Sequence, residues 1–140
     1  MWTLNRDKKI RVAVLLPEEL METVKVIGKD QDGRLMITEF NYNNETYRVI
    51  NVHCPNIGGE RKTFVKELNK WCVNTKNCFI IGDFNMCLSK LDRTNENKYK
   101  NDSSRTELIN LMGQNNLIDI WRSLKPNKRQ KYKSLNIHQN

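Results

Sequence analysis

A chain of 140 residues is long enough for one domain with one core, and short for two. Hydrophobic residues make up only 38% of it, but they occur in runs that indicate a folded protein, and none of these runs approaches the roughly 20 apolar residues of a membrane span. The net charge of +8 favours a polyanionic partner such as DNA or RNA, or else reflects solvated loops rich in Lys and Asn. Because no secretory signal is recognisable either, we expect a soluble protein of the nucleus or cytoplasm.

The first third of the chain predicts strands separated by turns. An apolar run ended by Pro17 predicts a buried strand, and the polar turn that ends in Gly33 and the pair Asn43-Asn44 predict hairpin-like connections farther on. We therefore expect an antiparallel meander that leads into a central strand, with its strands at residues 12–16, 22–27, 34–41 and 46–52.

Two helices are predicted by apolar residues at spacings of three and four. The first covers about 60–73, on the spacing of Phe64, Leu68, Trp71 and Cys72. A long polar loop at 89–104 precedes the second, a short helix that should end at Gly113 and Asn115-Asn116. We expect the apolar cluster after it to pack down before Pro126; its members are Leu117, Ile118, Ile120, Trp121 and Leu124.

The segment 78–85 (CFIIGDFN) combines a short apolar run with a glycine, a carboxylate and an amide. Its β-branched and aromatic residues predict a central strand covered on both faces, and Gly82 allows the backbone to turn where this strand ends. If the extended geometry continues through Phe84, the side chains of Asp83 and Asn85 lie on the same side of the strand, where open sheets bind ligands. The alternative, equally supported, is a turn in which both side chains cap backbone amides.

The sequence predicts no zinc site, since it has no C-x-x-C pair and no nearby histidine at zinc-ligand spacing; its four cysteines are Cys54, Cys72, Cys78 and Cys87. Cys72 and Cys78 are typical of small core residues in a reduced protein.

Motifs in a fixed order resemble the endonuclease/exonuclease/phosphatase superfamily, and are most similar to the apurinic-endonuclease-like domain of LINE-type retrotransposons. Residues 51–56 (NVHCPN) are similar to the family's N-x-Y-x-P-N motif, and residues 82–85 are its G-D-F-N motif. Three further segments agree, namely 32–34 (DGR), 88–93 (LSKLDR) and 117–122 (LIDIWR), so that the resemblance extends over about 12–132.

The resemblance implies a four-layered α/β sandwich of two facing mixed sheets flanked by helices, and an Mg²⁺-dependent (or Mn²⁺-dependent) hydrolase of DNA phosphodiesters. Asp83 then resembles the carboxylate that orients or deprotonates the water, with a weaker role in metal binding, and Asn85 resembles the amide that hydrogen-bonds the phosphate. Asn56 would support the site, or else only begins a turn after Pro55. His53 replaces the family's phosphate-contacting tyrosine; it can donate a hydrogen bond, or it is an ordinary polar residue.

The sequence also departs from the family at both ends. The metal-binding glutamate of the family precedes the segment matched at Val12, and its terminal Asp-His pair follows the region of Tyr132; neither is found at its expected place. We therefore expect one partial domain, with a core at about 12–124 and a basic tail at 125–140, and little or no activity. The alternative is a non-catalytic nucleic-acid-binding remnant, and exposed sheet edges would favour self-association in either case.

Overall fold

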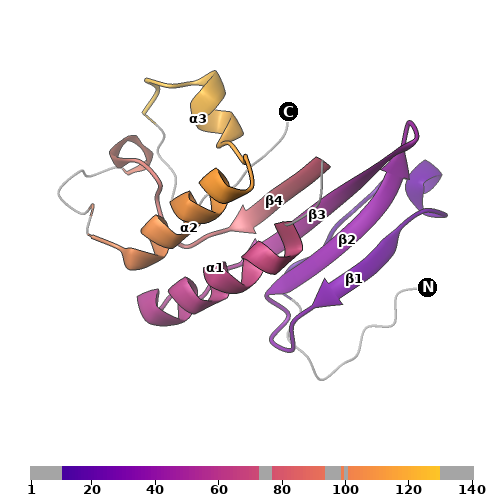
Figure 1. Ribbon diagram of the computed structural model, residues 1–140, viewed down its shortest axis with the longest axis horizontal. Coiled ribbons are helices and arrows are strands. Elements are labelled where there is room, and N and C mark those ends of the chain that lie inside the picture. Colours follow the sequence, from indigo (N-terminus) through magenta and orange to yellow (C-terminus); the bar gives the residue numbers. More distant parts are fainter. Residues whose placement is uncertain (1–10, 73–76, 94–98, 100, 130–140) are drawn as a thin grey trace. The chain divides into compact units, whose positions relative to one another are not determined.

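The computed structural model describes residues 11–72, 77–93, 99 and 101–129. The chain divides into two compact units. We call them the sheet unit (Met1–His53 and Thr75–Ile81) and the helical unit (Cys54–Asn74 and Gly82–Asn140). The expected α/β class is confirmed, since the described residues form one four-stranded mixed sheet and three α-helices (Figure 1). The prediction of one domain with a basic tail stays a prediction.

The sheet has the strand order β1-β2-β3-β4. Its strands are β1 (Lys25–Lys29), β2 (Leu35–Tyr42), β3 (Glu45–His53) and β4 (Asn77–Asp83). The first three are antiparallel neighbours, which confirms the predicted meander. β4 runs parallel to β3, because Asn77 Nδ2 at the start of β4 donates to Thr46 O (3.3 Å), while at the other end of β4 the N–H of Cys54 donates to Asp83 O (2.7 Å).

The β2–β3 hairpin follows from its two central residues. Asn43 and Asn44 have φ values of 50° and 62°, and two successive positive φ angles are typical of the type I′ turn that suits the twist of antiparallel strands. The turn sets the register in which Ile37 lies opposite Ile50. Both of these side chains are fully buried, so the core of the sheet unit lies at this pair.

Two strand predictions are wrong. Residues 12–16 form no strand, and Leu15 is 93% exposed; the segment is attached by isolated hydrogen bonds, such as Asn51 Nδ2 to Ala13 O (2.7 Å), rather than by a ladder. β4 was expected as a central strand covered on both faces, but it is an outer strand of the described sheet and every one of its residues is only half-buried. In both cases the apolar run has the composition of a buried strand, but composition does not determine which strands pair with it.

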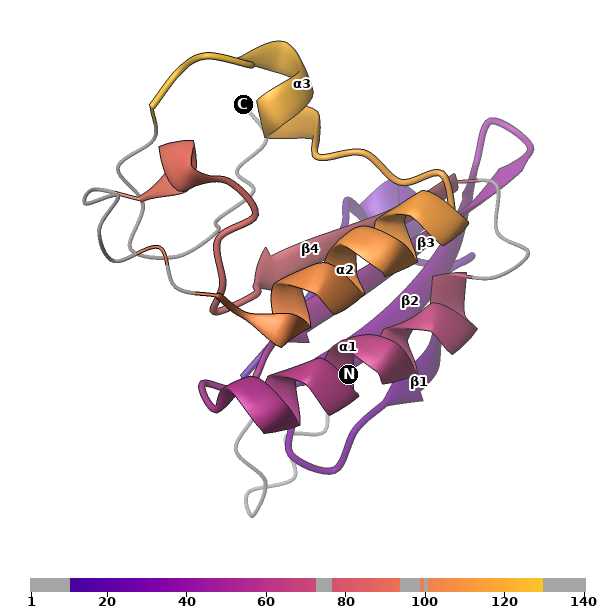
Figure 2. The ribbon, with the colours of Figure 1, turned by 60° about the vertical axis from the view of Figure 1, so that its left-hand side comes forward.

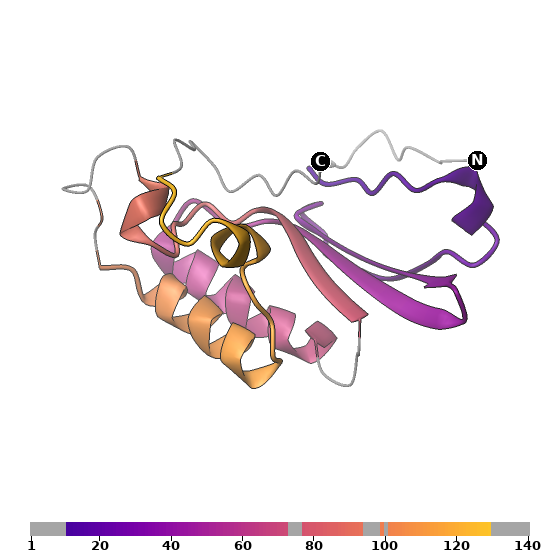
Figure 3. The same ribbon diagram turned by 90° about the horizontal axis from the view of Figure 1, so that it is seen from above.

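The helical unit contains α1 (Gly58–Cys72), α2 (Ser103–Gln114), the short α3 (Ile120–Leu124) and the 3-10 turn η2 (Lys90–Asp92). A second 3-10 turn, η1 (Glu18–Leu20), belongs to the sheet unit and precedes β1. α1 and α2 lie side by side (Figures 2 and 3). They are parallel, because Arg61 bonds Ser104 near their first turns and Asn69 bonds Asn115 near their last. None of the helices in the described ranges combines the length and apolarity needed to span a bilayer.

The end of α2 corrects one prediction in detail. Gly113 lies inside the helix, and Asn116, with φ of 53°, is the left-handed residue that ends it. The N–H of Leu117 then donates to Met112 O (2.9 Å), which satisfies one of the last helical carbonyls.

The predicted packing of the apolar cluster after α2 is wrong for three of its members. Ile118, Ile120 and Leu124 are 69%, 44% and 71% exposed. Polar contacts are made in this segment, since Asp119 caps the first turn of α3 through the N–H of Arg122 (2.9 Å) and Arg122 binds the carboxylate of Asp92.

Candidate functional site

The Gly82-Asp83-Phe84-Asn85 segment changes direction at its carboxylate. Gly82 has φ of 122°, a conformation that favours glycine, and Asn85 has φ of 51°, so the extended geometry does not continue to Asn85. The N–H of Asn85 donates to Asp83 Oδ1 (2.9 Å), which forms an Asx turn. For Asp83, the structure thus agrees with the turn alternative.

The side chain of Asn85 does something that neither alternative predicts. Its Nδ2 donates to the carbonyl of Cys54 (2.6 Å) instead of accepting from an amide. Cys54 in turn donates its own N–H to Asp83 O (2.7 Å). The turn after β4 and the segment after β3 are therefore joined at Cys54, which is completely buried. One N–H and the Oδ1 of the Asn85 amide are not used in this bond.

Arg61 of α1 holds the next two carbonyls of the same segment. Its Nη1 donates to Pro55 O (3.0 Å) and to Asn56 O (2.8 Å). The successive carbonyls of Cys54, Pro55 and Asn56 are thus all bound by side chains, one by Asn85 and two by Arg61. The Asn56 side chain itself is exposed.

The remaining nitrogens of Arg61 bind the start of α2. Nε donates to Ser104 Oγ (2.9 Å) and Nη2 to Asp102 Oδ2 (2.9 Å), while Asp102 Oδ1 accepts from the N–H of Ser104 (2.9 Å) as the helix cap. Burial disfavours the ionised form of Asp102, but the hydrogen bonds from Ser104 and Arg61 outweigh it and lower the pKa of this carboxyl below its ordinary value. Arg61 is only 7% exposed, so its charge is balanced inside the unit.

His53 is placed differently from the other predicted site residues. It is the half-buried last residue of β3, its N–H donates to Arg34 O (2.8 Å), and it belongs to the sheet unit. Asp83, Asn85 and Asn56 belong to the helical unit, where hydrogen bonds through Cys54 and Arg61 connect the Asp83 turn to the backbone at Asn56. The phosphate role of His53 stays a prediction.

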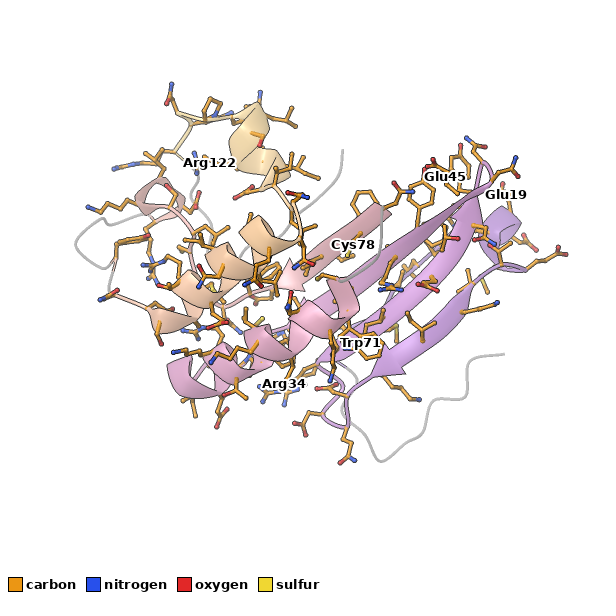
Figure 4. The ribbon with its side chains drawn as sticks, in the orientation of Figure 1. Glu19, Arg34, Glu45, Trp71, Cys78 and Arg122 are labelled. Carbon is orange, nitrogen blue, oxygen red and sulfur yellow. The ribbon has the colours of Figure 1, made fainter. Side chains whose placement is uncertain are left out.

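Two of the segments that carry the family resemblance meet elsewhere in the helical unit. Arg122 lies on α3 (Figure 4). Its Nη2 binds the carboxylate of Asp92, and its Nη1 donates to the carbonyls of Lys125, Pro126 and Lys128. Asp92, which is 4% exposed, also accepts from the N–H of Ser89 (2.9 Å) in the capping box of η2. This pairing links η2 to α3.

A magnesium site is not completed by the residues that the structure describes. Among them, no three His, Cys, Asp or Glu side chains gather where they could hold a metal ion. Asp83 alone supplies one carboxylate, and one of its oxygens already accepts the N–H of Asn85. The described donor set therefore does not fit Mg²⁺, which takes six oxygen ligands.

The sequence analysis missed Arg61, although a signal was present. The buried face of α1 consists of Arg61, Val65, Leu68 and Cys72, at spacings of four, three and four. A charged residue on the same stripe as the core residues is a sign of a buried, paired charge. The predicted stripe contained Leu68 and Cys72, which are buried, but it also contained Phe64 and Trp71, which are only half-buried, and it omitted Arg61.

Comparisons with known proteins relate the chain to a transposon. No model of a known protein family matches it. It is 34% identical over 97 residues to the "Transposon TX1 uncharacterized 149 kDa protein" of Xenopus laevis, an alignment that covers 67% of this chain and 7% of that protein. Among solved structures, it is similar to a β-hairpin deletion mutant of beta toxin from Staphylococcus aureus, with a TM-score of 0.43 and 15% identity over 79% of this chain and 45% of that one. The chain is thus similar in sequence to a small part of a transposon protein.

Proposed function

We propose that the chain is part of a transposon endonuclease domain of the endonuclease/exonuclease/phosphatase type, and that it contributes Asp83 and Asn85 to the hydrolysis of DNA phosphodiesters. The observation that carries this proposal is the junction at Cys54, which joins the Asp83 turn to the start of the segment after β3. Similarity to a transposon protein supports it. The proposal includes the four-layered sandwich, of which the described sheet would be one layer.

The two side chains divide the chemistry between them. The Oδ2 oxygen of Asp83, which is not used in the Asx turn, would orient a water and accept its proton. The second N–H of the Asn85 amide would donate to a phosphate oxygen as negative charge develops on it. The water oxygen forms the new bond to phosphorus while the bond to the leaving oxygen breaks. Mg²⁺ or Mn²⁺ belongs to the proposal through the family resemblance, and its other ligands would have to come from outside the described residues.

A nicking assay with a charge-neutral replacement tests this function. Supercoiled plasmid is incubated with Mg²⁺ and an excess of the chain, so that a slow single turnover is measured. Asp83→Asn keeps an oxygen for the Asx turn but removes the general base, and loss of a general base slows a reaction by about 10²- to 10⁴-fold. Asp32→Asn, at an exposed carboxylate in the turn before β2, is the matched control.

We expect weak nicking that is lost in Asp83→Asn and unchanged in Asp32→Asn. Equal conversion by the unaltered chain and by Asp83→Asn, at a level above that of plasmid without protein, would show that Asp83 is not part of a phosphodiesterase site.

A second candidate function is binding of nucleic acid without catalysis. The net charge of +8 favours it, as do the exposed residues Lys125, Lys128 and Arg129 after α3. If these three contact phosphates, affinity for a fluorescent DNA duplex should fall roughly 40-fold between about 50 and about 200 mM salt. In a plot of the logarithm of the affinity against the logarithm of the salt concentration, replacing Lys125 and Lys128 together by Gln should reduce the magnitude of the slope by about 1.8.

The control replaces Lys25 and Lys29 of β1, which are equally exposed, by Gln. An equal decrease of the slope in both double variants would indicate diffuse attraction by net charge instead of a site after α3.

A further inference from the structure

The geometry points to Arg61 as a positioning residue of the proposed site: we infer that its guanidinium fixes the Cys54–Pro55–Asn56 segment and thereby sets the geometry of Asp83 and Asn85. This inference rests on the proposed function. Arg61 touches neither of these two side chains, so any effect on them passes through the backbone.

The contacts of Arg61 require the shape of a guanidinium. All three of its nitrogens donate, to four partners: Ser104 Oγ, the two carbonyls of Pro55 and Asn56, and Asp102 Oδ2, at 2.8 to 3.0 Å. A planar fork with five N–H groups can satisfy four acceptors in different directions at once. A lysine ammonium in the same place would keep the positive charge, but its three donors lie on one atom and cannot reach both sides.

The path from Arg61 to the candidate site is short and continuous. Arg61 holds the carbonyls of Pro55 and Asn56, and the adjoining residue Cys54 accepts from Asn85 Nδ2 (2.6 Å) and donates to Asp83 O (2.7 Å). Each of these residues lies in the helical unit. If the Pro55 and Asn56 carbonyls are released, the Cys54 peptide is free to rotate, and both contacts to the Asp83 turn lengthen.

Asp102 and Ser104 keep the guanidinium itself in place. Ser104 is completely buried, and the Asp102 carboxylate pairs with Nη2, so Arg61 is anchored on the side away from the carbonyls. A flexible arginine would gain little by binding two carbonyls, because ordering its long side chain costs entropy. The start of α2 thus holds the Arg61 side chain in the conformation that binds the carbonyls of Pro55 and Asn56.

The test compares Arg61→Lys with Arg122→Lys. Arg122 is a matched control because it lies in the same unit, pairs with a carboxylate and also holds backbone carbonyls, but it binds the segment around α3. Three quantities are measured for each variant: the single-turnover nicking rate with Mg²⁺, the affinity for the DNA duplex, and the NMR signals of the Asn85 side-chain amide and the Cys54 backbone N–H.

In Arg61→Lys we expect the nicking rate to fall by about 10- to 100-fold, as for misplaced catalytic groups. The DNA affinity should change by less than about twofold, because it depends on phosphate contacts elsewhere. The Asn85 and Cys54 signals should move toward their values in unstructured peptides, as their hydrogen bonds lengthen. Arg122→Lys should leave the Asn85 and Cys54 signals in place. A role in stability alone would not separate rate from affinity in this way.

Unchanged Asn85 and Cys54 signals in a folded Arg61→Lys variant would overturn the inference. If the unaltered chain does not nick DNA, the proposed function fails, and the NMR signals still decide whether Arg61 sets this geometry. If Arg61→Lys does not fold, Asp102→Asn takes its place, since it keeps a cap for α2 but weakens the anchor of Arg61. The Asn85 and Cys54 signals should then shift in the same direction by a smaller amount, and an unchanged spectrum would count against the inference.

Discussion

The largely buried pair of Asp92 and Arg122 should contribute far more to stability than the exposed pair of Glu67 and Lys70. The Asp92 and Arg122 side chains are 6% and 20% exposed, whereas those of Glu67 and Lys70 are 62% and 58% exposed. Asp92→Ala removes the partner of Arg122 and also the carboxylate of the η2 capping box. The lost cap costs about 1 kcal/mol.

Leaving a buried charge unpaired costs about 3 to 5 kcal/mol. The low end of that range, or less, applies here, because Arg122 keeps its bonds to the carbonyls of Lys125, Pro126 and Lys128 at 3.0 to 3.2 Å. We therefore expect Asp92→Ala to lower the free energy of unfolding by about 3 kcal/mol, which corresponds to a decrease in the melting temperature of about 10 °C for a chain of this size.

Thermal unfolding followed by far-ultraviolet circular dichroism measures this difference. Glu67→Ala is the control, and it should leave the melting temperature unchanged within error, because an exposed ion pair contributes little. A double-mutant cycle with Arg122→Ala isolates the coupling, which should exceed about 1 kcal/mol. Equal melting temperatures for Asp92→Ala and Glu67→Ala would refute the reasoning that burial makes the first pair different.

Two further predictions concern pH and the hairpin. Because the hydrogen bonds from Ser104 and Arg61 lower the folded-state pKa of Asp102, the ionised carboxylate stabilises the fold above about pH 4 and this stabilisation is lost as the pH falls through the lowered value. The difference in urea midpoint between the unaltered chain and Asp102→Asn should therefore shrink at acid pH. A difference that stays constant from neutral to acid pH would contradict a stabilising role of the ionised carboxylate. At the hairpin, Asn44→Gly should be neutral or stabilising, whereas Asn44→Val should cost about 1 to 2 kcal/mol in urea unfolding, since φ is 62° there; similar midpoints for both variants would count against the type I′ turn.

Local patterns in the sequence predicted most of the elements, because they depend on neighbouring residues. The spacing in α1 and the turn residues around β2 and β3 place these elements to within about two residues. Failures occurred where the outcome depends on distant partners. The run at 12–16 has the composition of a buried strand, but in the described part of the chain no ladder forms along it. α3 escaped prediction because a five-residue helix has too few positions to show a period.

The residues of the candidate site could be proposed from the sequence and stay a prediction, whereas the hydrogen bonds that connect them could not be predicted. Asp83 and Asn85 could be proposed because glycine, carboxylate and amide side chains follow an apolar run. That the Asn85 amide binds the Cys54 carbonyl depends on a contact across 31 positions of the chain. The Arg61 contacts span up to 43 positions of the chain, and some of them are to backbone carbonyls. Because every residue carries a backbone carbonyl, the sequence does not indicate which carbonyls are bound.

The conformation of Gly82 has a consequence for how copies of a mobile element would decay. Its φ of 122° lies in a region that residues with a Cβ avoid, so every missense mutation at this codon introduces strain where β4 ends. Exposed positions such as Lys66 or Gln114 carry no such restriction. In a lineage of copies that drift without selection, replacements at Gly82 would thus distort the Asp83 turn long before the cores of the two units lose their stability, so that the proposed site would be lost while the protein still folds.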